Sequence, residues 1–111
     1  MRRTIIESPY AGGLLRCWLN RRYARKALRD SLMRGESPLA SHLLYTQCLC
    51  DADPHERKIG IDAGLEWGAE ADATVVYADG GITPGMRLGI ERAKAEGRPV
   101  EYRSLYGRVA Q

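Results

Sequence analysis

Metal ligands are scarce in this sequence. It holds only 2 histidines and 3 cysteines among 111 residues. Cys48 and Cys50 are separated by a single residue, which is the wrong spacing for a zinc knuckle, and no second pair of ligands lies near them. No Ser-His-Asp or Cys-His spacing stands out either. We therefore expect neither a metal site nor a cofactor.

Long apolar runs are also lacking. Arg2 and Arg3 precede an apolar run of only three residues, 4–6, which is too short for a signal peptide or a membrane span. The odd number of cysteines, with no signal peptide ahead of them, favours free thiols in a reducing compartment. We expect a cytoplasmic protein that does not enter a membrane.

The chain has no internal repeat and no low-complexity tract. Its composition, 44% hydrophobic and 28% charged, is that of an ordinary globular protein. A length of 111 residues leaves no room for a second hydrophobic core. The sequence therefore predicts one domain over residues 1–111.

Positive charge is mild overall but unevenly placed. The net charge is +3, and seven of the 17 lysines and arginines lie between Arg16 and Arg34. Such a run can bind nucleic acid or another anionic partner, or it can be the solvated face of a helix. The interleaved apolar residues follow helical periodicity, which favours the solvated face.

The apolar pattern alternates between strands and helices. The run 73–77 is continuously apolar, as is typical of a parallel strand covered on both faces. Strands separated by helices imply right-handed crossovers and an α/β fold with a parallel sheet. The strands are expected at 4–7, 39–45, 73–77 and 99–102, and the helices at 18–34, 53–70 and 83–97.

Two of the predicted helices carry sequence signals for where they begin and for which face they bury. Asp53 as N-cap, Pro54 at the first helical position and Glu56 form a predicted capping box. Further along that helix, glycines at 60, 64 and 68 form a bare ridge that the sheet or a partner helix can approach. In the helix at 18–34, Asn20 falls on an inward stripe at helical spacing, whose other members are Tyr23, Ala24, Ala27, Leu28, Ser31 and Leu32.

The two most glycine-rich loops follow strands, at 8–13 and 78–84. In parallel sheets, ligands bind beyond the carboxyl ends of the strands, so we place the site there. Thr83 and Pro84 start a helix whose free amides, with Gly85 beside them, favour an anion such as phosphate. An ordinary capped loop explains the same residues equally well.

Several side chains near these loops are candidate ligand contacts. Ser8 and Tyr10 offer a hydroxyl and an aromatic ring that either bind a base or sugar or simply pack. Asn20 either holds a ligand or ties down the first loop, because a buried amide needs partners. His42 lies in an apolar segment and is more typical of a satisfied core residue than of a catalyst.

In their order and spacing, these segments resemble the nucleoside 2-deoxyribosyltransferase-like family, in particular its short phage and bacterial members. The likeness covers nearly the whole chain, and no single piece is diagnostic. The matching pieces are Ser8-Pro9-Tyr10-Ala11-Gly12, Asn20 with Tyr23-Ala24, Ser41–Tyr45, Ala71–Tyr77 leading into Asp79, Gly81–Met86 and Gly97–Arg103.

The resemblance implies a small flavodoxin-like or Rossmann-like three-layer sandwich with a mostly parallel four-stranded sheet. It also implies a nucleotide or nucleoside in the cleft, a homodimer, and, for a phage-encoded protein, location in the bacterial host cytoplasm. In catalytic members a glutamate on the third helix attacks the anomeric carbon of the sugar. That position is Gly89 here, and Glu91 points elsewhere because two residues turn a helix by about 200°.

Three functions remain open from the sequence. Either Glu7 or Asp79, at the strand ends, replaces the missing glutamate in an N-glycosidase or deoxyribosyltransferase, or the protein binds a nucleotide signal without cutting it, as in phage–host conflict. The third is a nucleic-acid or protein-binding module that uses the basic helix, although no groove-reading motif supports nucleic acid. The expected ligand-binding residues are Ser8, Tyr10, Gly12, Asn20, His42, Asp79, Thr83, Gly85 and Met86.

Overall fold

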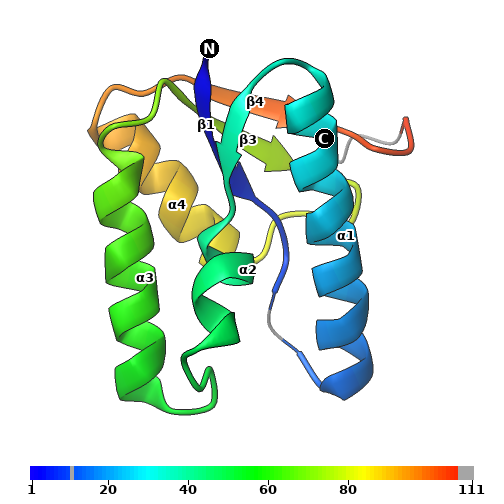
Figure 1. Cartoon of the computed structure of the whole chain (residues 1–111), viewed down its shortest axis with the longest axis vertical. Helices are drawn as coiled ribbons and strands as arrows, with labels where there is room; N and C mark the ends of the chain where they lie inside the picture. Colours follow the sequence, from blue (N-terminus) through cyan, green and yellow to red (C-terminus); the bar gives the residue numbers. More distant parts are fainter. Residues whose placement is uncertain (11, 108–111) are drawn as a thin grey trace.

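A parallel β-sheet lies at the centre of the fold (Figure 1). In the computed structural model, which describes residues 1–10 and 12–107, this sheet has four strands in the order β2-β1-β3-β4, all parallel. The fold class expected from the sequence is confirmed. The elements in chain order are β1 (Arg3–Glu7), α1 (Leu14–Met33), β2 (Ser37–Leu39), α2 (Ser41–Leu44), the 3₁₀ helix η1 (Tyr45–Gln47), α3 (Pro54–Gly68), β3 (Ala73–Tyr77), α4 (Pro84–Ala95) and β4 (Val100–Arg103).

Helices cover the sheet on both faces. Figure 1 shows α1 on one side and α3 with α4 on the other. On the α1 side, Ala27 packs against Ile6 and Tyr77, and on the other side Val76 packs against Ile90 of α4. Every residue of β3 is buried, because neighbours along this strand face opposite layers. The predicted continuous apolar run is therefore the central strand of a three-layer sandwich.

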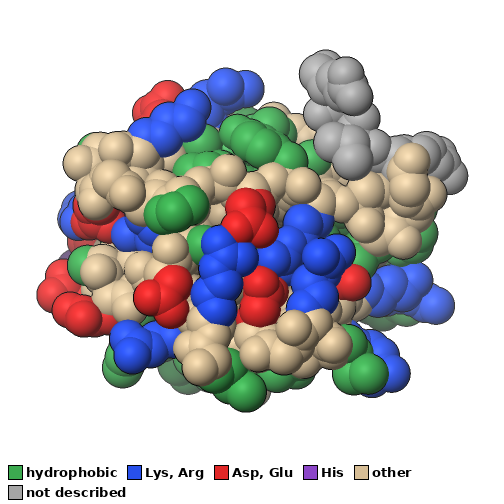
Figure 2. All heavy atoms as spheres, turned by 90° about the horizontal axis from the view of Figure 1, so that it is seen from above, with side chains coloured by type: hydrophobic (Ala, Val, Ile, Leu, Met, Phe, Trp, Pro, Cys, Tyr) green, Lys and Arg blue, Asp and Glu red, His purple; other side chains and the backbone are tan. Residues whose placement is uncertain are grey.

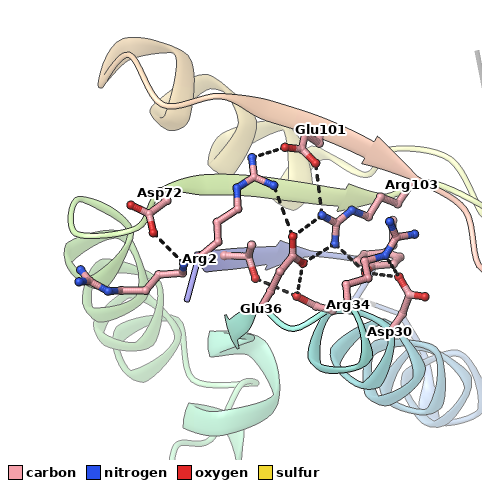
Figure 3. Close-up of polar contacts among 11 residues, drawn as sticks. Arg2, Asp30, Arg34, Glu36, Asp72, Glu101 and Arg103 are labelled. Carbon is pink, nitrogen blue, oxygen red and sulfur yellow. Dashed lines mark hydrogen bonds and ion pairs between the residues drawn. The ribbon is translucent and has the colours of Figure 1, made fainter.

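A network of ion pairs, with the buried Arg103–Glu36 pair at its centre, joins the two edges of the sheet (Figure 3). Arg103 of β4 donates two hydrogen bonds of 2.7 Å to the two carboxylate oxygens of Glu36, which precedes β2. Glu36 also accepts from Ser31 of α1 at 2.7 Å, and Arg2 pairs with both Glu36 and Glu101. Figure 2, which views the molecule of Figure 1 from above, shows acidic and basic side chains interleaved on this face.

The structure corrects two predicted elements. Helix α1 begins at Leu14 rather than near Trp18, since Leu14 and Leu15 are exposed and give no inward apolar signal. The segment 39–45 is a strand only up to Leu39 and then forms helix α2. Its apolar run is too short for periodicity to separate strand from helix. The helical turn lets Leu43 pack on the core beside Ala40.

Two packing predictions also need correction. Leu32, expected on the inward stripe of α1, is 54% exposed, whereas Asn20 is buried as expected. The capping box at α3 is half formed: Asp53 caps the helix, but the Glu56 side chain accepts from the amide of Cys50 at 2.9 Å instead of from the N-cap amide. The glycine ridge of α3 is approached by both a helix and the sheet, as expected: a Cβ on Gly64 would lie 2.6 Å from Ser41 Oγ of α2, and one on Gly68 would lie 3.9 Å from Ile5 of β1.

Within residues 1–10 and 12–107, no helix is long and apolar enough to cross a membrane. The homodimer and the single-domain organisation remain predictions.

We expect the Glu36→Gln substitution to lower the free energy of unfolding at pH 7 by about 3 kcal/mol, because it removes the buried charge partner of Arg103 and leaves only the more exposed Glu101 at 3.2 Å. Hydrogen bonds from Arg103 lower the pKa of Glu36 to about 2. This carboxylate therefore stabilises the fold above its ordinary pKa, and the contribution disappears as pH falls from about 4.5 towards 2. Urea unfolding at pH 7 and pH 3 measures both effects.

The control is Asp62→Asn, which removes the exposed i,i+4 pair with Lys58. It should cost less than about 0.5 kcal/mol. An equal loss in the two variants would show that the Glu36–Arg103 pair contributes no more than a surface pair.

Candidate active site

A cleft of about 340 Å³ opens at the carboxyl end of β1, next to the start of α4. Its walls come from the end of β1 and the loop after it, from α2, from α3 and from the first turns of α4. Tyr10 and Thr83 both line it, so the two predicted loops meet as expected from the sheet topology. The predicted residues that line this cleft are Ser8, Tyr10, His42, Thr83, Gly85 and Met86, together with Glu7 and Gly89.

The carboxylate of Glu7 occupies the space beside Gly89. Glu7 is the last residue of β1, and Gly89 is buried on the inward side of α4. A Cβ on Gly89 would overlap the carboxylate group of Glu7, so any other residue at 89 would displace it. The chain therefore carries a carboxylate at this point of the cleft, although it comes from the strand and not from the helix.

The environment of Glu7 disfavours its charge. Burial raises the pKa of Glu7 to about 8, and the nearby positive charge of Arg98 offsets only part of this effect. Arg98 itself is held by Glu96 at 2.6 Å and by Thr74 at 3.0 Å. Among the described residues, no donor forms a hydrogen bond with the Glu7 carboxylate. A partly buried acid with a strongly shifted pKa in a cleft is a candidate for catalysis.

Ser8 and His42 form a second polar pair in the cleft. The Oγ of Ser8 lies 2.6 Å from Nε2 of His42, and the ring of Tyr10 meets the imidazole edge-on with the centroids 6.3 Å apart. Burial lowers the pKa of His42 to about 4, so the ring is neutral at pH 7. His42 is thus a satisfied, partly buried histidine, as its apolar context indicated, but it also lines the cleft.

The start of α4 offers less to an anion than the sequence suggested. Thr83 caps the helix as predicted, with its Oγ1 accepting from the amide of Met86 at 3.2 Å and its carbonyl from Arg87 at 3.0 Å. Pro84 has no amide hydrogen. Within the described residues this leaves Gly85 as the one first-turn amide without a hydrogen bond. Among the described residues that line the cleft, the one arginine or lysine is Arg57 on α3, whose side chain is exposed.

Sequence reasoning missed the contribution of α3 to this cleft. The glycine ridge was visible in the sequence, and Gly60 and Gly64 do line the cleft. A Cβ on Gly60 would lie 3.2 Å from Leu49, which shows how closely the segment after α2 approaches. The spacing of the glycines correctly indicated that another segment packs closely against α3. Which segment that is could not be deduced from the sequence without the position of α2.

The remaining predicted residues lie outside the cleft. Asn20 and Asp79 line a separate cavity beside α1. Gly12 lines neither cavity; its backbone has φ +144°, and a Cβ there would overlap the side chain of Arg16. Ala11 of the predicted loop is outside the described residues.

Asp79 is a structural carboxylate in this fold. It accepts hydrogen bonds from Tyr23 and Ser104 at 2.5 Å each, and from the amides of Leu105 and Tyr106 at 2.8 and 3.1 Å. Burial alone would raise the pKa of Asp79, but these hydrogen bonds lower it to about 2. The carboxylate anchors the segment after β4, so of the two candidate acids only Glu7 faces the cleft.

No group of three or more histidine, cysteine, aspartate or glutamate side chains within residues 1–10 and 12–107 is arranged to hold a metal ion. The cleft presents instead the carboxyl groups of Glu7, Asp51 and Glu56, hydroxyl groups, an imidazole, aromatic rings and the guanidinium of Arg57.

Two solved structures have this fold. The 2-deoxyribosyltransferase of the psychrotolerant bacterium Bacillus psychrosaccharolyticus aligns with a TM-score of 0.67 and 18% identity over 98% of this chain and 77% of its own. The CMP N-glycosidase of Clostridium botulinum aligns with a TM-score of 0.56 and 11% identity over 93% of this chain and 71% of its own. At such identities the comparison establishes a shared fold, that of a nucleoside deoxyribosyltransferase.

No curated protein matches the sequence. One family of sequences does, and the match covers residues 2–103. The chain belongs to this family, which is described as a domain of unknown function, DUF7768.

Proposed function

We propose that this protein binds a nucleoside or nucleoside monophosphate in the cleft at the end of β1 and breaks its N-glycosidic bond, with Glu7 as the reacting carboxylate. The observation that carries the proposal is the place of the Glu7 side chain, in the space that a side chain on Gly89 would fill. In the enzymes that the sequence resembles, a glutamate at that helical position attacks the sugar. Here β1 supplies the carboxylate in its stead.

The two structural neighbours support the choice of substrate class. One is described as a 2-deoxyribosyltransferase for nucleoside synthesis and the other as a CMP N-glycosidase. Both descriptions involve the bond between a base and the anomeric carbon of its sugar. The ring of Tyr10 suits a base or sugar face, and Arg57 with the Gly85 amide suits a phosphate group.

The proposed reaction proceeds in two displacements. The ionised Glu7 carboxylate attacks the anomeric carbon while the carbon–nitrogen bond breaks, and the leaving base takes that electron pair and a proton from solvent. Water then hydrolyses the glycosyl ester, or a second base accepts the sugar, and Glu7 is regenerated. The form that reacts is the carboxylate, which its environment disfavours at neutral pH.

A second candidate function is binding without cleavage. This function is favoured by the surroundings of Glu7. A nucleophilic carboxylate has to be held in place, and none of the described residues donates a hydrogen bond that would orient Glu7. In that case Glu7 stays protonated and donates a hydrogen bond to the ligand. The two functions are distinguished by incubating the protein with a ligand: cleavage releases a free base, whereas binding alone leaves the ligand intact.

We expect Glu7→Gln to lower the rate of base release at least about 100-fold, because the amide cannot act as the nucleophile. The measurement is chromatography of free base after incubation with a panel of nucleosides and nucleoside 5′-monophosphates. Glu91→Gln is the matched control, an exposed glutamate on α4 outside the cleft, and should retain full activity. Thermal stabilisation by a nucleotide without any base release would support the binder, and an active Glu7→Gln variant would exclude Glu7 as nucleophile.

The pH dependence of kcat/KM should separate a nucleophile from a general acid. Because burial raises the pKa of Glu7 to about 8, the carboxylate fraction grows as pH rises, and kcat/KM should increase between pH 6 and 9 with a midpoint near 8. The Glu91→Gln control should give the same profile. A rate that falls over this interval would indicate that the protonated form of Glu7 is the reactive one.

Glu7 should also reduce the stability of the fold at alkaline pH. Its pKa is higher in the folded chain than in the unfolded chain, so the unfolded state loses this proton first, and stability falls as pH rises from about 4.5 to about 8. Glu7→Gln should therefore raise the free energy of unfolding at pH 8 by roughly 1–3 kcal/mol, with little gain at pH 4.5. Urea titrations at the two pH values test this, and an equal effect at both would contradict the shifted pKa.

A further inference from the structure

A second cavity, of about 800 Å³, lies beside α1 and is distinct from the Glu7 cleft. Its walls are the face of α1 from Arg16 to Lys26, the loop after β3, and Tyr106 beyond β4. It shares only Thr83 with the Glu7 cleft. We call it the basic cavity, because Arg16, Arg22 and Lys26 all line it.

The three cations of the basic cavity have no acidic partner among the described residues. Arg22 instead lies over the ring of Trp18, with its guanidinium carbon 5.7 Å from the centroid. The Nζ of Lys26 lies 5.5 Å from the ring centroid of Tyr106 and 3.3 Å from its hydroxyl oxygen. Positive charge that no carboxylate neutralises, beside an aromatic ring, is suited to an anionic group on a planar ligand.

Asp79 is the acidic residue of the cavity wall, and its oxygens are already occupied. Four hydrogen bonds from Tyr23, Ser104 and two backbone amides hold it on the side of the segment after β4. The same four bonds fix Tyr106 at the cavity edge, because the amide of Tyr106 is one of the donors. Among the described residues, Asp79 thus shapes the cavity without forming an ion pair with Arg16, Arg22 or Lys26.

We propose that the basic cavity binds a phosphorylated small molecule, with its phosphate groups on Arg16, Arg22 and Lys26 and a planar portion near Tyr106. Three of the six basic side chains of α1 converge on one hollow, which favours a compact ligand over nucleic acid. The other basic side chains of α1, Arg21, Arg25 and Arg29, do not line the cavity. This site does not depend on the chemistry proposed for Glu7.

The experiment is isothermal titration calorimetry with inorganic pyrophosphate at 150 mM salt. The test variant is the triple substitution Arg16→Gln, Arg22→Gln and Lys26→Gln. The matched control is Arg21→Gln, Arg25→Gln and Arg29→Gln, which removes the same charge from the same helix outside the cavity. We expect the test variant to weaken binding at least about tenfold and the control less than about twofold. Circular dichroism checks that both variants fold.

Three outcomes would overturn the proposal. They are no binding of pyrophosphate by the wild-type protein, equal weakening in the two triple variants, and binding of a single-stranded oligonucleotide that both triples reduce equally. The last result would identify a nucleic-acid surface with diffuse charge. Glu7→Gln should bind pyrophosphate as the wild type does, so a failure of the Glu7 mechanism leaves this test unaffected.

Discussion

The parallel pairing of β1 with β3 is the constraint on which the rest of the structure depends. Its register sets Glu7 opposite Val76, so both strands end at the same edge of the sheet. The loop after β1 and the start of α4 then meet in one cleft, and α2 completes its wall because β2 is only three residues long. The ion pair between Arg103 of β4 and Glu36, which precedes β2, connects the two edges of the same sheet. The sheet that carries the cleft is therefore held together at both edges.

The contact between Glu7 and Gly89 connects the scaffold to the chemistry. A carboxyl group at the end of a buried strand is costly, since burial disfavours its charge and none of the described residues donates a hydrogen bond to it. Gly89 leaves the space in which this group lies, at the expense of helix propensity within α4. Two local choices that weaken the fold thus coincide at one point in the cleft, as is common at functional sites.

The two carboxyl groups near the strand ends, Glu7 and Asp79, have opposite pKa shifts because their environments differ. Asp79 accepts four hydrogen bonds and its pKa falls to about 2, so it is an anchor for the segment after β4. Glu7 accepts none from the described residues and its pKa rises to about 8. The two cavities differ in the sign of their charge: Glu7, Asp51, Glu56 and Arg57 line the Glu7 cleft, whereas Arg16, Arg22, Lys26 and Asp79 line the basic cavity. One fold therefore contains two separate cavities of different chemistry.

Local signals in the sequence determined the fold class and the edge of the sheet at which the cleft lies. The continuous apolar run of β3, the Thr83–Pro84 start of α4 and the Asp53–Pro54 start of α3 depend on neighbouring residues alone, and all three are correct. Tertiary structure decided the rest. The segment 39–45 divides into β2 and α2 because of packing partners distant in the sequence, and the division of Asn20 and Asp79 from the Glu7 cleft has the same origin. That the Glu7 carboxylate fills the space beside Gly89 follows from a contact across 82 residues of chain, which no local pattern encodes.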